Sequence, residues 1–436
     1  MNIKLFDFDK KRLLALAVNI SVALILCMPV ALIFKPSPAI LVICAALSVI
    51  LMVLFFRRRQ FTPKSCLVAA GIILAAFIAR LTLLELTPPG YTQTIDSWLT
   101  HLQKGGGLFA LSGDLSAMSG PMLILALISH AGDDRLRLVG MVPIVFDFIL
   151  AWFSMRLMLA LSASRNKALA TFALVLLLPV VPMASALTGL YDSVYAALVM
   201  ACLFFALTGS PSRAMLSFGF AFAAGSPAFF LVPTLAILLL TSRIRQRNLL
   251  YAPAALFVCM MPSILLGRPV FDLLKLLFSP RSGFLQMTVP FGLHAFLGLP
   301  EPTATVVTGA TAVLFFGAAC VVIAMNIAKF DKFVLLLTSF IFSAAAPFLM
   351  PSVLAGSFFI ALILSLIYAV VRPSRFYIPV LMAAATGAEL YYVLIRRGMP
   401  DPRLFSILIA IAVAAACADL WRMLYPKPAT VSAAGA

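Results

Sequence analysis

The chain consists mainly of long apolar runs, each close to the roughly 20 residues that cross the hydrocarbon of a bilayer as a helix. Lipid offers no hydrogen-bond partner to a peptide group, so a run that lies in a membrane must satisfy its backbone internally. The runs cover residues 13–34, 40–56, 66–84, 138–161, 168–187, 191–207, 249–266, 303–328, 333–350, 353–371, 376–395 and 404–424. The sequence therefore predicts an all-α, polytopic integral membrane protein with about twelve full transmembrane helices.

Composition excludes a soluble protein and a nucleic-acid-binding protein. Only 11% of the residues are charged, whereas a soluble domain carries about 25%. The net charge of +17 comes from Lys and Arg that lie mostly in short connections between apolar runs, where they set orientation. No basic face with interleaved aromatic residues is present, so we expect membrane lipids, and no nucleic acid, as partners.

Three segments depart from the pattern of full spans. The apolar run 215–241 is interrupted by Gly225-Ser226-Pro227; proline removes a helical donor and disfavours helix in its predecessor, so we expect two half-helices. Residues 118–129 are too few to span and predict a surface helix. Residues 271–278 alternate apolar side chains with Asp272 and Lys275, a pattern typical of a second helix at the membrane surface.

The basic connections predict the orientation. With the half-helices crossing out and back, most of them fall on one side, which is cytoplasmic by the positive-inside rule. They are Lys10-Lys11-Arg12, Arg57-Arg58-Arg59, Arg165 with Lys167, Arg213, Arg243 with Arg245 and Arg247, Lys329 with Lys332, and Arg372 with Arg375. We expect a multi-pass protein of the inner (plasma) membrane, with both termini cytoplasmic and residues 85–137 and 267–301 forming two outer loops.

The first outer loop, residues 85–137, contains five carboxylates: Glu85, Asp96, Asp114, Asp133 and Asp134. Ordinary connections are about 4–6 residues long, so a long acidic loop is a candidate functional site. Asp96 lies a few residues beyond a predicted span, where a carboxylate meets both lipid headgroups and water. It is either a solvated loop acid or a catalytic base, and Asp114 is a candidate substrate-binding residue.

Four further charged residues are candidates for substrate binding. Asp147 lies inside an apolar run, where a carboxylate is costly and usually paired; it joins helices or lines a site. Arg80, near the outer end of its helix, either extends to the interface or clamps a phosphate. Asp192 either has a structural role, as a helix cap or a loop contact, or belongs to the substrate-binding site. Arg268, together with Lys275, either anchors lipid headgroups or binds a lipid phosphate.

Metal and cofactor chemistry is not indicated. The seven cysteines are scattered, almost all in apolar runs, and form no CxxC pair. The three histidines, His101, His130 and His294, are far apart and form no metal-ligand spacing. We therefore expect neither a metal nor a cofactor.

Four segments together resemble a known group. The segment 188–195 resembles the "GQ-x-D-s" element of C-type (GT-C) glycosyltransferases, and 219–227 is similar to their half-helix turn. Gly267-Arg268-Pro269 resembles the motif that opens their second outer loop, and the acid-then-Trp order at Asp96 and Trp98 is similar to their first outer loop. The nearest group is the prokaryotic relatives of GPI mannosyltransferase II. The likeness covers about residues 66–371.

The resemblance implies an organisation and a reaction. It divides the chain into an extra N-terminal helix pair (1–64), a GT-C-like core (65–371) and a C-terminal helix pair with a tail (372–436). Asp96 matches the acid proposed as general base in these enzymes. They transfer a sugar, here mannose by analogy, with inversion from a polyprenyl-phosphate sugar donor to a glycolipid or envelope glycan acceptor outside the cytoplasm.

The sequence is also compatible with two other functions. Family positions that would hold polar groups carry Met118, Leu190, Gly225 and the segment 354–356, which favours a catalytically degenerate accessory subunit that binds a partner subunit. The broken helix and the intramembrane acid are also features of transporters, here a flippase of lipid-linked intermediates. No matching break is evident in the second half of the chain.

Overall fold

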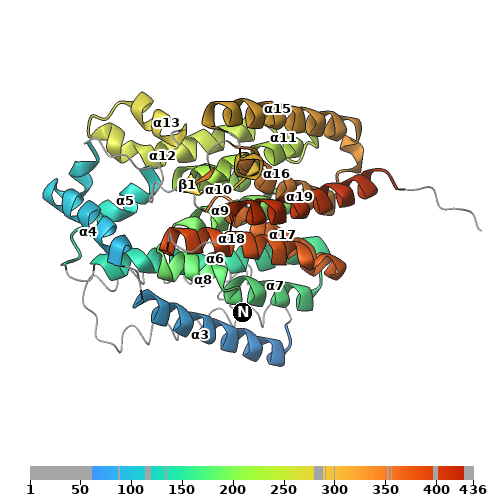
Figure 1. The fold of residues 1–436 in the computed structure, drawn as a ribbon. Coiled ribbons are helices and arrows are strands. Elements are labelled where there is room, and N and C mark those ends of the chain that lie inside the picture. The colour runs from blue at the N-terminus through green and yellow to red at the C-terminus, as the bar shows by residue number, and fades with distance from the viewer. Residues whose placement is uncertain are drawn as a thin grey trace, which may run out of the picture.

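The computed structural model describes residues 61–86, 89–112, 119–132, 135–278, 288–289, 291–298, 300–350, 353–354, 356–395 and 401–426. Across these residues the chain is almost entirely helical, with one antiparallel pair of two-residue strands. Most helices run side by side in a common direction, and α4, α5 and α13 gather at one end of the bundle (left in Figure 1).

Six of the described helices are long and apolar enough to cross a membrane, and a bent pair brings the number to seven. The six are Pro63–Leu84, Arg135–Ser162, Gln246–Leu265, Pro302–Met325, Lys332–Leu349 and Pro402–Leu424. These helices are consistent with a helical membrane protein. The predicted spans at residues 13–34 and 40–56 lie outside the described residues.

The polar segment after the first described helix folds into a helical cap. The elements are α3 (Pro63–Leu84), α4 (Pro89–Lys104), η1 (Gly107–Ser112) and α5 (Ser119–Ile128). We use "the cap" for α4, η1 and α5. The short helix predicted at residues 118–129 is present as α5, and its place at the membrane surface stays a prediction. The cap packs on the bundle through buried Ile95, Leu99 and Leu125, which share one cluster with Tyr191 and Val194.

The centre of the bundle contains two broken helices. The elements are α6 (Arg135–Ser162), α7 (Arg165–Leu177), α8 (Val180–Pro182), η3 (Met183–Leu187), α9 (Asp192–Leu207), α10 (Pro211–Ala224), η4 (Ser226–Leu231) and α11 (Val232–Leu240). The predicted break after Ala224 is confirmed: α10 ends there and Gly225 is extended. The span predicted at 168–187 is not one straight helix: α7 and the segment 180–187 are bent by 45° around Pro179, which lacks a helical donor.

The described C-terminal part of the chain adds eight α-helices, three 3-10 helices and the strand pair. The elements are η5 (Gln246–Leu250), α12 (Tyr251–Leu265), α13 (Val270–Phe278), β1 (Thr288–Val289), α14 (Leu293–Leu297), α15 (Glu301–Met325), η6 (Ile327–Lys329), α16 (Lys332–Leu349), β2 (Val353–Leu354), α17 (Phe359–Val371), η7 (Pro373–Arg375), α18 (Tyr377–Ile395) and α19 (Pro402–Leu424). The amphipathic helix predicted at 271–278 is present as α13, and its place at the membrane surface stays a prediction. The helix predicted at 353–371 begins only at Phe359. Val353 pairs with Val289, and Gly356 has φ of +83°, a left-handed conformation outside the helical region.

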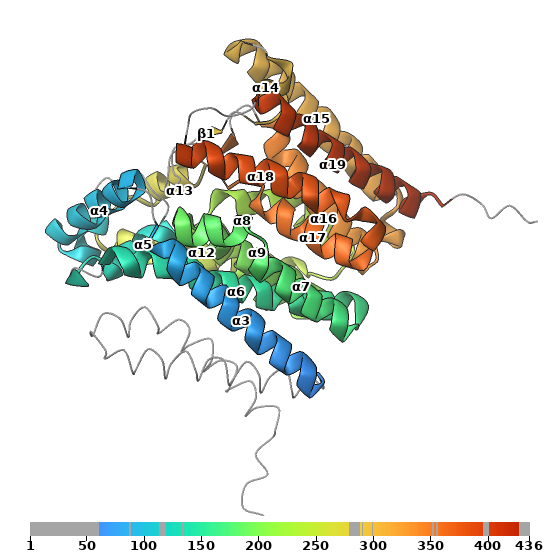
Figure 2. The same ribbon diagram turned by 60° about the horizontal axis from the view of Figure 1, so that its bottom comes forward.

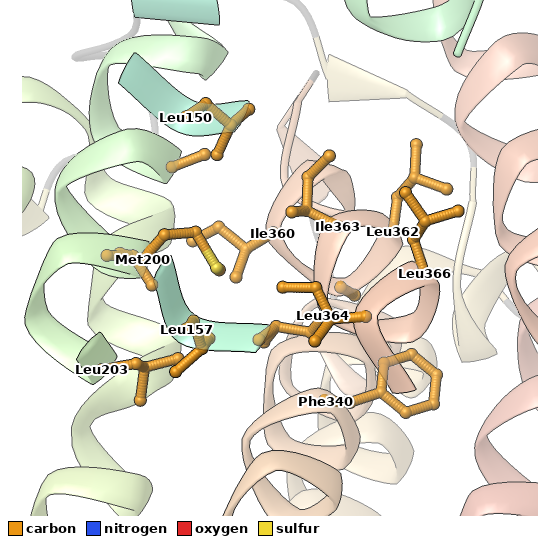
Figure 3. Close-up of a cluster of buried hydrophobic side chains, with 14 of the residues drawn as sticks. Leu150, Leu157, Met200, Leu203, Phe340, Ile360, Leu362, Ile363, Leu364 and Leu366 are labelled. Carbon is orange, nitrogen blue, oxygen red and sulfur yellow. The ribbon is translucent and has the colours of Figure 1, made fainter. Parts of the chain in front are cut away.

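The core joins helices from both halves of the chain. Figure 3 shows Leu150 and Leu157 of α6 and Met200 of α9 facing side chains of α16 and α17 such as Phe340 and Ile360. All of these are at most 1% exposed. This contact fixes the long α6 and α9 against the C-terminal helices, so residues far apart in the chain meet at both ends of the bundle.

The basic connections meet at the end opposite the cap. The Lys167 Nζ donates to the Val371 carbonyl (3.3 Å), and the Lys332 Nζ donates to the Ala160 carbonyl (3.1 Å). Arg243 donates to the Phe330 carbonyl. The 28 residues of α6 separate this end from the cap by about 42 Å. Figure 2 shows the same separation, with α4 and the far ends of α7 and α17 on opposite sides. The connections that contain Lys167, Arg243 and Lys332 therefore lie at one end of the bundle, whereas those at residues 10–12 and 57–59 lie outside the described residues.

Candidate functional site

Asp96 lies on a helix of the cap, paired with an arginine. Helix α4 buries Ile95, Leu99 and Leu102, which recur at the spacing of one helical face. The Asp96 Oδ1 accepts a hydrogen bond from the Arg135 Nη2 at 2.6 Å, and the Asp96 side chain is 44% exposed. The predicted polar loop 85–137 thus contains a helix at Asp96, which forms because the apolar face of α4 has the bundle and α5 to pack against.

Arg135 is one of two site residues that were not predicted from the sequence. It begins α6, and it also donates to Gln103 Oε1 at 2.8 Å and to Thr100 Oγ1 at 3.1 Å. A guanidinium has five donors, so this one keeps capacity for an additional oxyanion. Its signal in the sequence was weak, since a basic residue at the start of a span is ordinary. The pair places a partly exposed carboxylate beside a cation at the cap end.

Arg80 is buried in an ion pair, so the expectation that it extends to the interface is wrong. Its side chain has no exposure, and its Nε donates to Asp147 Oδ2 at 2.6 Å. Its two other nitrogens donate to the carbonyls of Ala76 (3.0 Å) and Leu176 (3.1 Å), and it lies over the Phe148 ring. An internal carboxylate and two carbonyls replace the water that would otherwise draw the guanidinium outward.

Asp147 connects helices, which is one of the two roles expected for it. Its Oδ2 accepts from Ser185 Oγ at 2.5 Å as well as from Arg80, and its Oδ1 accepts from Ser193. The carboxylate thereby joins α3, α6, η3 and α9. Every charge-bearing atom of this cluster has a partner within the protein, as a buried ion pair requires.

Asp192 faces a small cavity together with a second acid. It is the first residue of α9, is 7% exposed and benefits from the positive end of the helix dipole. Across the cavity lies Glu389 of α18, only 3% exposed. The lining residues are Val180, Ala184, Leu190, Asp192, Gly356, Phe359, Thr386, Glu389 and Leu390. The sequence analysis missed Glu389, although a carboxylate inside an apolar run is a sufficient signal.

Gly356 is the backbone against which both acids pack. Its N–H donates to Glu389 Oε1 at 2.6 Å, and its carbonyl accepts from the Tyr195 hydroxyl. A Cβ built on Gly356 would overlap the Asp192 carboxylate. The turn before α17 is therefore held by groups from α9 and α18, and only glycine fits there.

The remaining predicted residues are separate from these clusters. Arg268 is 7% exposed at the end of α12, where its N–H bonds the Ser263 carbonyl. Lys275 is exposed on α13 and pairs loosely with Asp272 at 3.6 Å. Asp114 lies outside the described residues. Within the described part of the chain, no group of three His, Cys, Asp or Glu side chains could hold a metal ion.

The structure thus places four of the predicted residues in three clusters: Asp96 with Arg135, Arg80 with Asp147, and Asp192 with Glu389. The first and third are connected through packing, because Tyr191 and Val194, which flank Asp192 and Ser193, belong to the cap cluster. No protein-family model matches this chain, and no curated protein matches it either.

Proposed function

We propose that the chain is a C-type membrane glycosyltransferase, with a fold of about twelve spans. It would transfer a sugar such as mannose from a polyprenyl phosphate to a lipid-linked or envelope acceptor. The observation that carries the proposal is the Asp96–Arg135 pair, a carboxylate and a guanidinium at 2.6 Å on a cap at one end of an apolar bundle. In the proposed orientation, a reactant anchored in lipid would reach this pair at the membrane surface.

The chemistry assigns one role to each member of the pair. The Asp96 carboxylate accepts the proton of the acceptor hydroxyl while that oxygen attacks the anomeric carbon. The bond from this carbon to the phosphate oxygen breaks, and the polyprenyl phosphate leaves with the electron pair. Arg135 orients the carboxylate and supplies positive charge for the leaving phosphate, which guanidinium groups bind well.

The basic end of the bundle supports the orientation that this reaction needs. Arg165, Lys167 and Lys332 lie at that end, and the positive-inside rule assigns it to the cytoplasm. The cap then faces outward from the plasma membrane, and both termini are cytoplasmic. Transfer on the outer face fits a donor whose lipid tail stays in the bilayer.

The test compares wild type with Asp96→Asn in isolated membranes, using radiolabelled mannose on a polyprenyl phosphate. We expect the variant to insert normally and to transfer about 100–10,000-fold more slowly, the usual contribution of a general base. Asp272→Asn, an exposed acid in a loose pair on α13, is the matched control and should transfer at the wild-type rate. Wild-type transfer by Asp96→Asn would remove Asp96 as the base.

The accessory function is the second candidate, and one observation favours it. Arg80, a candidate phosphate clamp, donates to Asp147 and two carbonyls. Its guanidinium is therefore already bound within the protein and is not positioned to bind the phosphate of a donor. A degenerate subunit would bind a polyprenyl phosphate without transferring sugar. Equal, background-level transfer by wild type and Asp96→Asn, with lipid binding retained, would select this function.

A further inference from the structure

Asp192 carries a buried carboxylate without a partner. The residue is 7% exposed and lines the small cavity beside α18. Among the residues that the structure describes, no hydrogen bond or ion pair reaches its side chain. Burying an ionised carboxylate without a donor or a cation is costly, and the positive end of the α9 dipole offsets only a small part of that cost, so this acid requires a ligand or a proton.

Glu389, the other acid of the cavity, differs from Asp192 in its donors. The Gly356 N–H points at its Oε1, and a donor of this kind stabilises the charged form of a carboxylate. Because the two acids share one cavity, ionising both would add mutual repulsion to the cost of burial. The arrangement therefore favours a charged Glu389 and a neutral Asp192.

The other groups that face the cavity do not supply a compensating charge. Tyr195 donates its hydroxyl to the Gly356 carbonyl, and Thr386 donates to the Met382 carbonyl. On the side of α6, Ser193 contacts Asp147, whose charge is matched by Arg80. The remaining lining side chains are apolar.

We propose that Asp192 and Glu389 form a proton-binding site that holds one proton on Asp192 and thereby closes the Gly356 turn against α9. The cavity has room for about one water molecule, which excludes a sugar ring. Its side chains offer few oxygens, whereas hard metal cations take about six. This inference does not depend on the proposed transferase activity.

Loss of the proton would weaken the attachment of the loop 267–301 to the bundle. A second negative charge would then face the Gly356 backbone, which Asp192 touches directly. The turn continues from β2, and β2 pairs with β1 in the second outer loop. The site can therefore couple proton uptake to the attachment of that loop to the bundle.

The test measures thermal unfolding of the full chain in detergent over roughly pH 5–9, the range around neutrality in which such a switch would operate. The folded protein binds this proton more tightly than the unfolded chain, so the melting temperature should fall as pH rises. Asp192→Asn mimics the neutral acid. This variant should flatten the slope of melting temperature against pH, and its melting temperature should exceed that of wild type at high pH.

A second measurement is infrared spectroscopy. The C=O band of a buried protonated acid should be present in wild type and lost in Asp192→Asn.

Asp419→Asn is the control, because Asp419 is equally buried but is paired with Arg375 and Tyr368. It should lower the melting temperature at every pH while keeping the wild-type slope. A wild-type slope in Asp192→Asn, or a wild-type protein without the infrared band, would overturn the proposal. Stabilisation at high pH by sodium chloride but not choline chloride would overturn it in favour of a sodium site.

Discussion

Arg80 shows that the direction in which a charged side chain points depends on the hydrogen-bond partners around it, and not only on its position along a membrane helix. A guanidinium at such a position would ordinarily extend to the interface, yet it donates inward to Asp147, Ala76 and Leu176. A buried pair is weak evidence for net stability, but removing one partner leaves an uncompensated charge. The same logic separates Asp147, which has three side-chain donors, from Asp192, which has none among the described residues.

The Arg80–Asp147 pair gives a prediction about stability. Asp147→Leu should lower the free energy of unfolding by about 3–5 kcal/mol, because Arg80 would stay buried without its counter-charge. The measurement is thermal unfolding in detergent, followed by the loss of the far-ultraviolet circular dichroism of the helices. The matched control, Arg80→Met with Asp147→Leu, should recover much of the loss. A single variant as stable as wild type would contradict this account.

At the scale of elements, close backbone contacts explain why small residues surround the broken helix. A Cβ on Gly219 would lie 2.8 Å from the Ala255 Cβ and overlap the Ala252 carbonyl, so α10 and α12 touch directly there. Six residues on, Gly225 ends α10 and faces the Tyr195 ring. The break thus lies against α9 beside the Gly356 turn, because Tyr195 also donates to that turn.

The helix contact predicts opposite effects for one substitution at two glycines. Gly219→Ala should destabilise by about 1–3 kcal/mol, since α12 must move to admit the methyl group. Gly309→Ala on α15, where nothing lies within 4 Å, should be neutral or stabilise by up to about 1 kcal/mol through helix propensity. Thermal unfolding of both variants in the same detergent checks this, and equal losses would refute the packing explanation.

At the scale of the whole molecule, the bundle has two chemically distinct ends. One end holds the cap and α13, with the Asp96–Arg135 pair partly exposed. The other end gathers lysines and arginines that bond carbonyls of neighbouring helices. Such polarity is what an oriented membrane protein needs, since it distinguishes the two faces of the bilayer.

Labelling of single introduced cysteines in intact cells tests this polarity. A membrane-impermeant maleimide should modify Lys104→Cys on α4 and Lys275→Cys on α13, and should leave Arg165→Cys unmodified until the cells are permeabilised. All three native side chains are exposed. A difference in labelling between the three positions would therefore report the side of the membrane and not burial within the protein. Modification of Arg165→Cys alone in intact cells would reverse the orientation and place Asp96 in the cytoplasm.

The sequence by itself determined the class of protein and the local breaks. Run length predicts helices because every backbone group must be satisfied in lipid, and Pro and Gly predict the break after Ala224 because their effect on φ and on donors is local. The helices α5 and α13 were also predictable, α5 from a run too short to span and α13 from its amphipathic pattern. These features depend only on neighbours along the chain.

Only the tertiary structure decided which charges meet. Asp96 and Arg135 are 39 residues apart, and Arg80 and Asp147 are 67 apart; Asp192 meets Glu389 only because α9 and α18 both border the Gly356 turn. The hydrophobic pattern of a segment predicts that the segment forms a helix. It does not predict which other helix packs against it, because any apolar face can pack on another. The partner of each carboxylate, and the absence of one for Asp192 among the described residues, therefore follow from how the helices pack.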